Sequence, residues 1–152
     1  MTALQLFRRL RGSAPGRWLF ARIVCLRAPY FASIAPRIDV LEPGRCVVRL
    51  RDRRGVRNHI GTVHAIALCN AAELAGGLAI DAALPATLRW IPKGMQVRYL
   101  KKAQGTLRAT AVVPPIDATA GAQEVHTKVE VLDGNDAAVF DADIAMWVSP
   151  KR

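Results

Sequence analysis

The longest apolar stretch of the chain begins after the polar residues Gly61 and Thr62 and continues to about Ile80. Apolar side chains, most of them small, cover nearly the whole circumference of a helix drawn over residues 62–80. A helix that is apolar all round is normally buried. We therefore expect one central helix of about 18 residues that the rest of the domain encloses.

Alternation of apolar and polar residues with a period of two predicts strands before and after this helix. Ahead of it, Cys46, Val48 and Leu50 would form the apolar face of a strand whose other face becomes basic. Behind it, strand patterns cover residues 89–99, 106–113, 124–131 and 137–148. We expect the first of these to be broken at the Pro-Lys-Gly segment 92–94.

Two short helices are predicted ahead of the strands. Thr2 and Gln5 fit a capping box at the start of the first helix, and the second would run from Pro15 to about Arg27. The face of the second helix that we expect to pack on the domain is formed by Leu19, Ile23 and Leu26, and Phe20 and Val24 widen it.

This order of elements predicts an α+β fold. A single long helix and one antiparallel sheet bury their apolar surfaces together only if the sheet wraps around the helix. We expect about five to six strands in that sheet. Residues 1–30 would form basic helices packed on the domain, and residues 31–152 the domain itself.

The net charge of +10 comes entirely from residues 1–57, which contain 13 Lys or Arg and 3 Asp or Glu, whereas residues 58–152 contain nine of each kind. Seven arginines precede the first acid, Asp39, a composition also typical of an organellar transit peptide. This segment is poor in serine, and its apolar residues have helical spacing. Both features favour helices that pack on the domain over a transit peptide. The basic segment lacks interleaved aromatics, so we expect no nucleic-acid partner. The N-terminal arginines would rather contact an anionic surface, such as a membrane or a carrier protein.

The three cysteines, Cys25, Cys46 and Cys69, are widely spaced and form no metal-ligand pattern with the histidines. We therefore expect reduced thiols in a cytoplasmic protein that requires no metal and no cofactor. No apolar run reaches the roughly 20 residues needed to span a bilayer.

Glu73 is a carboxylate placed about two turns inside the apolar central helix. Burying an acid in such surroundings is costly unless it is hydrogen-bonded, shifted in pKa or used chemically. The start of the helix offers free backbone N–H groups and a partial positive charge. A carboxylate and fixed N–H donors are the groups needed to activate water and polarise a carbonyl.

The spacing of residues around this carboxylate resembles a known pattern. Asn58 is followed six residues later by His64-Ala65, and Glu73 lies eight residues beyond Ala65. Over roughly residues 28–148 the chain resembles the hotdog-fold acyl-CoA thioesterases, in their PaaI-like branch (phenylacetate-pathway thioesterase-like) or a related uncharacterised branch. The resemblance implies hydrolysis of acyl-CoA or acyl-carrier thioesters.

The same resemblance implies a role for each residue. The backbone N–H of Ala65 would polarise the thioester carbonyl, and Glu73 would act as general base or as nucleophile. Asn58 would orient the water or the carbonyl, and His64 would hold the loop and the helix start. Two positions depart from the family pattern: Ala65 replaces a glycine, and Ile91 stands where some relatives have Ser or Thr.

The helix geometry also predicts an assembly. Eight residues of helix rise about 12 Å, so Ala65 and Glu73 of one chain would not meet at one carbonyl carbon. Two chains with antiparallel central helices would pair Glu73 of one with Ala65 of the other, as in hotdog relatives, so we expect a homodimer or a dimer of dimers. The phosphates of coenzyme A would meet basic residues near the cleft mouth, for which the candidates are Lys93, Arg53, Arg54, Arg57, Lys101 and Lys102.

Two alternatives stay open. The departures at Ala65 and Ile91 favour a non-catalytic hotdog module that binds acyl-CoA, a fatty acid or a protein partner. An acyl-thioester hydratase or dehydratase would use a histidine and an acid, but His64 and Glu73 lie nine residues apart on one helix.

Overall fold

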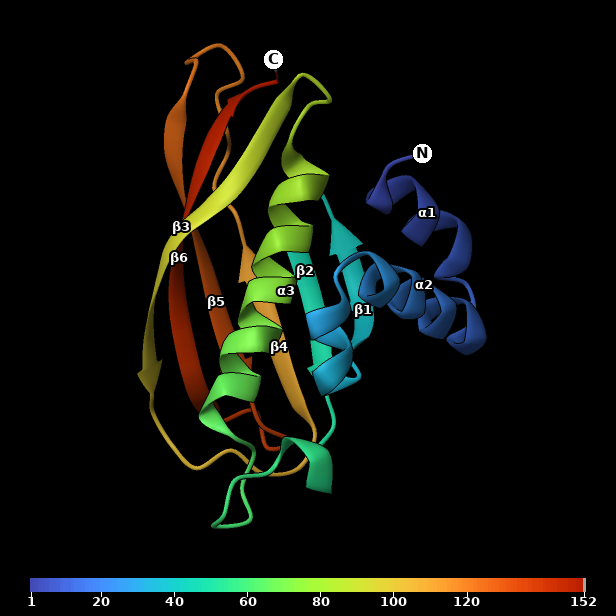
Figure 1. Cartoon of the computed structure of the whole chain (residues 1–152), viewed down its shortest axis with the longest axis vertical. Coiled ribbons are helices and arrows are strands. Elements are labelled where there is room, and N and C mark those ends of the chain that lie inside the picture. Colours follow the sequence, from blue (N-terminus) through green and yellow to red (C-terminus); the bar gives the residue numbers. More distant parts are fainter. Residues whose placement is uncertain (152) are drawn as a thin grey trace.

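The computed structural model describes residues 1–151 of the chain, in which helices pack on one sheet (Figure 1). Its elements, in which η marks a 3-10 helix, are α1 (Ala3–Leu10), α2 (Ala14–Arg27), η1 (Pro29–Ile34), β1 (Arg37–Glu42), β2 (Arg45–Leu50), η2 (Arg54–Val56), α3 (Ala65–Ala83), β3 (Leu88–Tyr99), β4 (Leu107–Val112), β5 (Gln123–Leu132) and β6 (Ala138–Pro150). The predicted α+β class, with one long helix and an antiparallel sheet, is confirmed.

The sheet has six strands in the order β1-β2-β4-β5-β6-β3, and every neighbouring pair is antiparallel. One face of it packs against α3, which lies in front of the sheet and runs roughly along β2 and β4 (Figure 1). The predicted alternation holds well in β5, where Val125, Thr127, Val129 and Val131 are buried and the residues between them are exposed. The edges of the sheet are β1 and β3.

Helix α3 begins at Ala65, three residues later than predicted. The reason is His64, which has an extended backbone and caps the helix by accepting a hydrogen bond at Nδ1 from the Ile66 N–H over 3.0 Å. Near its middle, a Cβ added to Gly76 would lie 3.0 Å from Ile144 Cδ1 of the sheet, so the glycine permits close packing. By length and hydropathy α3 could span a membrane, but 67% of its apolar window is buried in the domain, as in a core helix.

Helices α1 and α2 belong to the same core as the sheet. The rings of Phe7 and Phe20 pack edge to face with centroids 5.1 Å apart, and both are buried. This burial sets the rotation of α2, because the large Phe20 ring must face inward. The predicted packed face is therefore right at Phe20 but wrong at Leu19 and Leu26, which are 44% and 79% exposed.

The predicted break at residues 92–94 is also wrong. Strand β3 is continuous from Leu88 to Tyr99 and only shifts its register with β6 between Pro92 and Gly94. A proline fits here because β3 lies at the edge of the sheet, where a missing N–H costs no ladder hydrogen bond.

Candidate functional site

Glu73 lies on the exposed side of α3, at a cavity of about 350 Å³ between the N-terminal helices, α3 and β3. The expectation of a buried carboxylate is thus wrong for the chain by itself, because Glu73 is exposed to solvent there. The residues that line the cavity are Ala3, Val24, Arg27, Ala28, Phe31, Glu73, Leu74, Gly77, Leu78, Asp81, Trp90 and Pro92.

Most of this cavity is apolar. Leu74 and Leu78 are buried at its α3 wall, and Trp90 of β3 lies against Gly77, where an added Cβ would come within 2.9 Å of the indole. The glycine therefore allows the indole to lie directly on the helix. Asp81 is the second carboxylate of the lining, and Arg27 its one cation. The arrangement is an apolar slot with charged groups at its rim.

The start of α3 forms a separate polar region. The N–H of Ala65, in the first turn, makes no hydrogen bond to any group within residues 1–151. A hollow of about 160 Å³ opens beside this turn, lined partly by Tyr30, Arg57, His64 and Asn70. Free N–H groups and the helix dipole give this region an affinity for an oxygen that carries negative charge.

Asn58 organises the loop that leads into α3. Its Nδ2 donates to Thr62 Oγ1 over 2.9 Å, while its Oδ1 accepts from the N–H groups of Ile60 and Thr62 over 3.2 and 3.1 Å. Both ends of the amide are thus used within residues 58–62. The predicted role in orienting water stays a prediction, and the observed role is to hold the loop.

The site residue that the sequence prediction left unassigned is Asn70, which is 5% exposed and lines the hollow at the helix start. Its Nδ2 donates to Ser33 Oγ over 3.0 Å, whereas its Oδ1 has no hydrogen-bond partner among the described residues. A buried amide oxygen without a partner is costly. Its place in the sequence, inside an apolar helix and one turn before Glu73, suggests a bond across a dimer rather than a contact with substrate, and that stays a prediction.

The six basic residues predicted for coenzyme A do not gather around one cavity of the chain. Arg57 binds Asp52 over 2.6 Å and Lys101 binds Asp133 over 3.2 Å, so both have carboxylate partners. Lys93 lies over the ring of Trp147, 5.9 Å from its centroid. The other three are exposed, in or near η2 and after β3: Arg53, Arg54 and Lys102.

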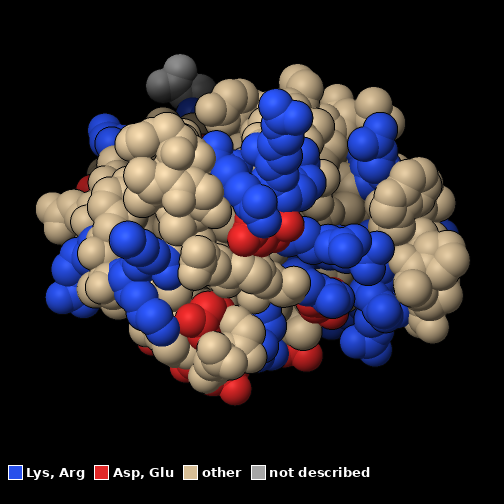
Figure 2. All heavy atoms as spheres, turned by 90° about the horizontal axis from the view of Figure 1, so that it is seen from below, with Lys and Arg blue, Asp and Glu red and all other residues tan. Residues whose placement is uncertain are grey.

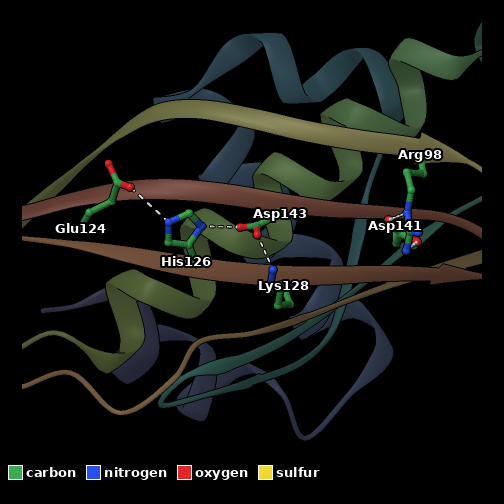
Figure 3. Close-up of polar contacts among 6 residues, drawn as sticks. All are labelled: Arg98, Glu124, His126, Lys128, Asp141 and Asp143. Carbon is green, nitrogen blue, oxygen red and sulfur yellow. Dashed lines mark hydrogen bonds and ion pairs between the residues drawn. The ribbon is translucent and has the colours of Figure 1, made fainter.

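A charged cluster covers the face of the sheet opposite α3 (Figure 3). His126 lies between Asp143, 2.7 Å from its Nδ1, and Glu124, 3.1 Å from its Nε2, and Asp143 also pairs with Lys128. The hydrogen bond and charge of Asp143, with a smaller contribution from Glu124, raise the pKa of His126. The sheet separates this cluster from Glu73, so it forms no common site with the carboxylate.

Ala65 and Glu73 do not share a cavity within one chain. Glu73 lines the apolar cavity, while His64 and Asn70 line the hollow at the start of α3. Across residues 1–151, no three His, Cys, Asp or Glu side chains are grouped in a way that could hold a metal ion. Within one chain, Glu73 and the residues at the start of α3 thus line different cavities.

The comparisons with known proteins agree with this architecture. The family described as "Domain of unknown function (DUF4442)" matches residues 16–148. A structural-genomics protein designated APC5556 is 45% identical, with a TM-score of 0.85, and the match covers 98% of this chain and 99% of that one. Among curated proteins, none matches.

Two more distant structures have names that mention a function or a pathway. A Pseudomonas aeruginosa protein, described as a probable thioesterase of unknown function, is 24% identical with a TM-score of 0.76, over 86% of this chain and 93% of that one. The phenylacetic acid degradation protein PaaI of Thermus thermophilus, solved as a mutant, is 20% identical with a TM-score of 0.67. That match covers 80% of this chain and 98% of PaaI. The hotdog fold expected from the sequence is confirmed.

Proposed function

The chain belongs to the DUF4442 family of hotdog proteins, and we propose that it hydrolyses acyl thioesters, with coenzyme A or an acyl carrier as the thiol. One observation carries this proposal. Glu73 stands at the rim of an apolar cavity, on the same helix whose first turn presents the free N–H of Ala65. The thioesterase names of several structures with this fold support it.

The reaction needs one donor and one base. The N–H of Ala65 donates to the thioester oxygen, which becomes more negative as water attacks the carbonyl carbon. Glu73 takes the proton of that water, the C–S bond breaks, and the thiolate leaves with the bonding electrons. The alternative route, attack by the Glu73 carboxylate to form an anhydride that water then opens, uses the same geometry.

A dimer supplies the donor and the base to one substrate. Ala65 and Glu73 are about 12 Å apart along α3, so one chain cannot bring both to a single carbon. Ile66 and Glu73 lie seven residues apart on α3 and are both exposed, and β3 leaves one sheet edge unpaired. Antiparallel pairing of two such chains would place Glu73 of one near Ala65 of the other.

The apolar cavity beside Glu73 suits the acyl group. Its volume of about 350 Å³ and its lining by Phe31, Leu74, Leu78 and Trp90 fit a hydrocarbon or aromatic chain rather than a polar one. The six predicted basic residues would then meet the phosphates of coenzyme A only from the assembled dimer. Of these, Lys93 lies one residue from Pro92 at the cavity wall.

The test is the release of free thiol from a panel of short, medium, long and aromatic acyl-CoAs. Glu73→Gln should lower kcat/KM by at least roughly 10²-fold, because general base catalysis contributes that much or more. Asp81→Asn is the matched control, since Asp81 lines the same cavity two turns further along α3. Equal loss in both variants, or full activity in Glu73→Gln, would overturn the assignment.

A non-catalytic binding module is the second candidate, and a specific observation favours it. Ile91 of β3, at the position where some relatives carry a hydroxyl, is 55% exposed and offers no hydrogen bond to a water. In that case acyl-CoA would raise the melting temperature of the protein without releasing thiol. Turnover that depends on Glu73 would exclude this reading.

A further inference from the structure

A second cavity, of about 380 Å³, lies between α2, the segment after η1 and the end of β2. Four arginines line it, which come from three separate parts of the chain: Arg22, Arg37, Arg51 and Arg53. The rest of the lining is formed by small apolar residues, the indole of Trp18 and one acid, Asp52. Lys and Arg side chains also crowd the right half of the molecular end shown in Figure 2, around a few acids.

None of the four guanidinium groups has a carboxylate partner within residues 1–151. Within residues 1–151, Arg22, Arg37 and Arg51 form no ion pair, and Arg22 lies over the Trp18 ring with 5.9 Å to its centroid. Arg53 is fixed by donating to the Ser33 carbonyl over 2.7 Å, which leaves its charge uncompensated. Four uncompensated positive charges that line one cavity favour the binding of an anion.

The one acid in the lining does not neutralise the cavity. Asp52 accepts from Arg57 Nε over 2.6 Å and from the Gly105 N–H over 3.0 Å. The Arg57 guanidinium, more than any other group, holds the pKa of this carboxyl below its usual range. Its charge is therefore compensated by an arginine that does not line the cavity.

We propose that this arginine cavity binds a phosphate-bearing group. Guanidinium groups match the oxygens of phosphate in bidentate pairs, and a phosphate ester or diphosphate carries enough negative charge to meet several of them. A carboxylate supplies a single charge and would leave most of the cavity uncompensated. The Trp18 indole and the alanine wall contact the less polar remainder of the ligand.

The site is distinct from the cavity that contains Glu73. Helix α2 separates the two, because Ala21, Arg22 and Cys25 line the arginine cavity while Val24 and Arg27 line the other. The proposal therefore does not depend on thioester hydrolysis. It goes beyond the predicted contact of N-terminal arginines with an anionic surface, because it names a cavity to which β1 and the segment after β2 contribute.

Two sources would supply the phosphate: a soluble phosphate ester or the headgroup of an anionic lipid. The outer face of α2, next to the cavity, exposes Leu19 and Leu26 together with Trp18. Apolar side chains beside arginines suit the boundary between headgroups and acyl chains. The experiment therefore has one arm for each source.

In the soluble arm, calorimetry measures the binding of pyrophosphate to the whole chain. The double variant Arg37→Gln/Arg51→Gln should raise the Kd for pyrophosphate by at least roughly tenfold, since each substitution removes a charge-assisted contact. The matched control is Arg8→Gln/Arg9→Gln, which removes the same charge from α1, outside the cavity. It should change Kd by less than about twofold. Circular dichroism establishes that both variants are folded.

In the lipid arm, sedimentation measures binding to vesicles of phosphatidylglycerol and of phosphatidylcholine. A lipid headgroup is identified as the source if the protein binds only the anionic vesicles and if both Leu26→Ser and the cavity double variant weaken that binding. Pyrophosphate binding without vesicle binding identifies a soluble ester. If neither probe binds, or if the Arg8/Arg9 control weakens binding as much as the cavity variant, the proposal is overturned.

Discussion

Among single residues, Asn58 lies in the loop where the spacing puts it, and its side chain makes hydrogen bonds that the spacing did not predict. The sequence spacing puts it at the loop before α3, where the structure has it, but its amide bonds only to Ile60 and Thr62. A spacing pattern specifies which residues are near a site. It does not specify which hydrogen bonds a side chain makes, because these depend on the fold of the loop.

We predict that Asn58→Ala destabilises the chain by about 1–3 kcal/mol, because it leaves loop N–H groups without their acceptor. Asn58→Asp retains the oxygen that accepts from Ile60 and Thr62 and should recover most of this loss. Urea unfolding of the three proteins measures the difference. Equal stability of Asn58→Ala and the unmodified chain would show that the loop does not need the amide.

His126 makes the stability depend on pH. Since Asp143, and to a lesser extent Glu124, raises its pKa, the folded state binds the proton more tightly than the unfolded chain. This stabilisation is fully present below the ordinary histidine pKa of about 6.5 and is lost as the pH rises through the higher folded pKa.

The variant His126→Gln should therefore flatten the dependence of unfolding free energy on pH above about 6.5. The effect is at most about 1 kcal/mol, because the imidazole is half exposed and such pairs are screened. His59→Gln, in an exposed loop, is the control and should leave the profile unchanged. If neither substitution changed the dependence of unfolding free energy on pH, the assignment of that dependence to His126 would be contradicted.

Helices and strands follow the apolar pattern of the sequence where that pattern leaves one face to bury. They depart from it where two faces of the same element are apolar. Strands β5 and β6 have the predicted inward faces, since alternation by two leaves only one way to bury them. Helix α2 has apolar residues on two faces, and periodicity alone could not choose between them. The contact between Phe7 and Phe20, from two different helices, decides it.

A substitution can test what fixes the start of α3. His64 caps the helix through its Nδ1, so His64→Ala should destabilise the chain by about 1 kcal/mol. His64→Ser, whose hydroxyl accepts the same kind of bond, should recover that stability. Thermal unfolding compares the three. A stable His64→Ala variant with impaired turnover would instead assign the imidazole to the chemistry.

At the scale of the whole molecule, the open side of α3 and the unpaired edge at β3 leave the candidate site incomplete. Glu73 is exposed in one chain, although the sequence suggested a buried acid. A partner that covered this side would enclose the carboxylate and bring it to the free N–H of Ala65. Assembly and activity should then depend on the same surface.

We predict that Ile66→Arg, on the open side of α3, converts the dimer to a monomer and removes hydrolysis together. Ile66 is 52% exposed in the chain, and a charge there would oppose burial in an interface. Leu26→Arg, at a position 79% exposed on α2, is the control and should remain a dimer. Analytical ultracentrifugation and thiol release report the two outcomes. A fully active monomer would refute the shared site.

The sequence by itself determined the α+β class, the long apolar helix, the strands and their inward faces, and the spacing of Asn58, Ala65 and Glu73. It could do so because helical and strand periods and capping residues act over a few neighbouring positions. The tertiary structure alone decided the rotation of α2, the continuity of β3, the exposure of Glu73 and the convergence of four arginines on one cavity. Each of these depends on contacts between segments far apart in the chain, which no local pattern encodes.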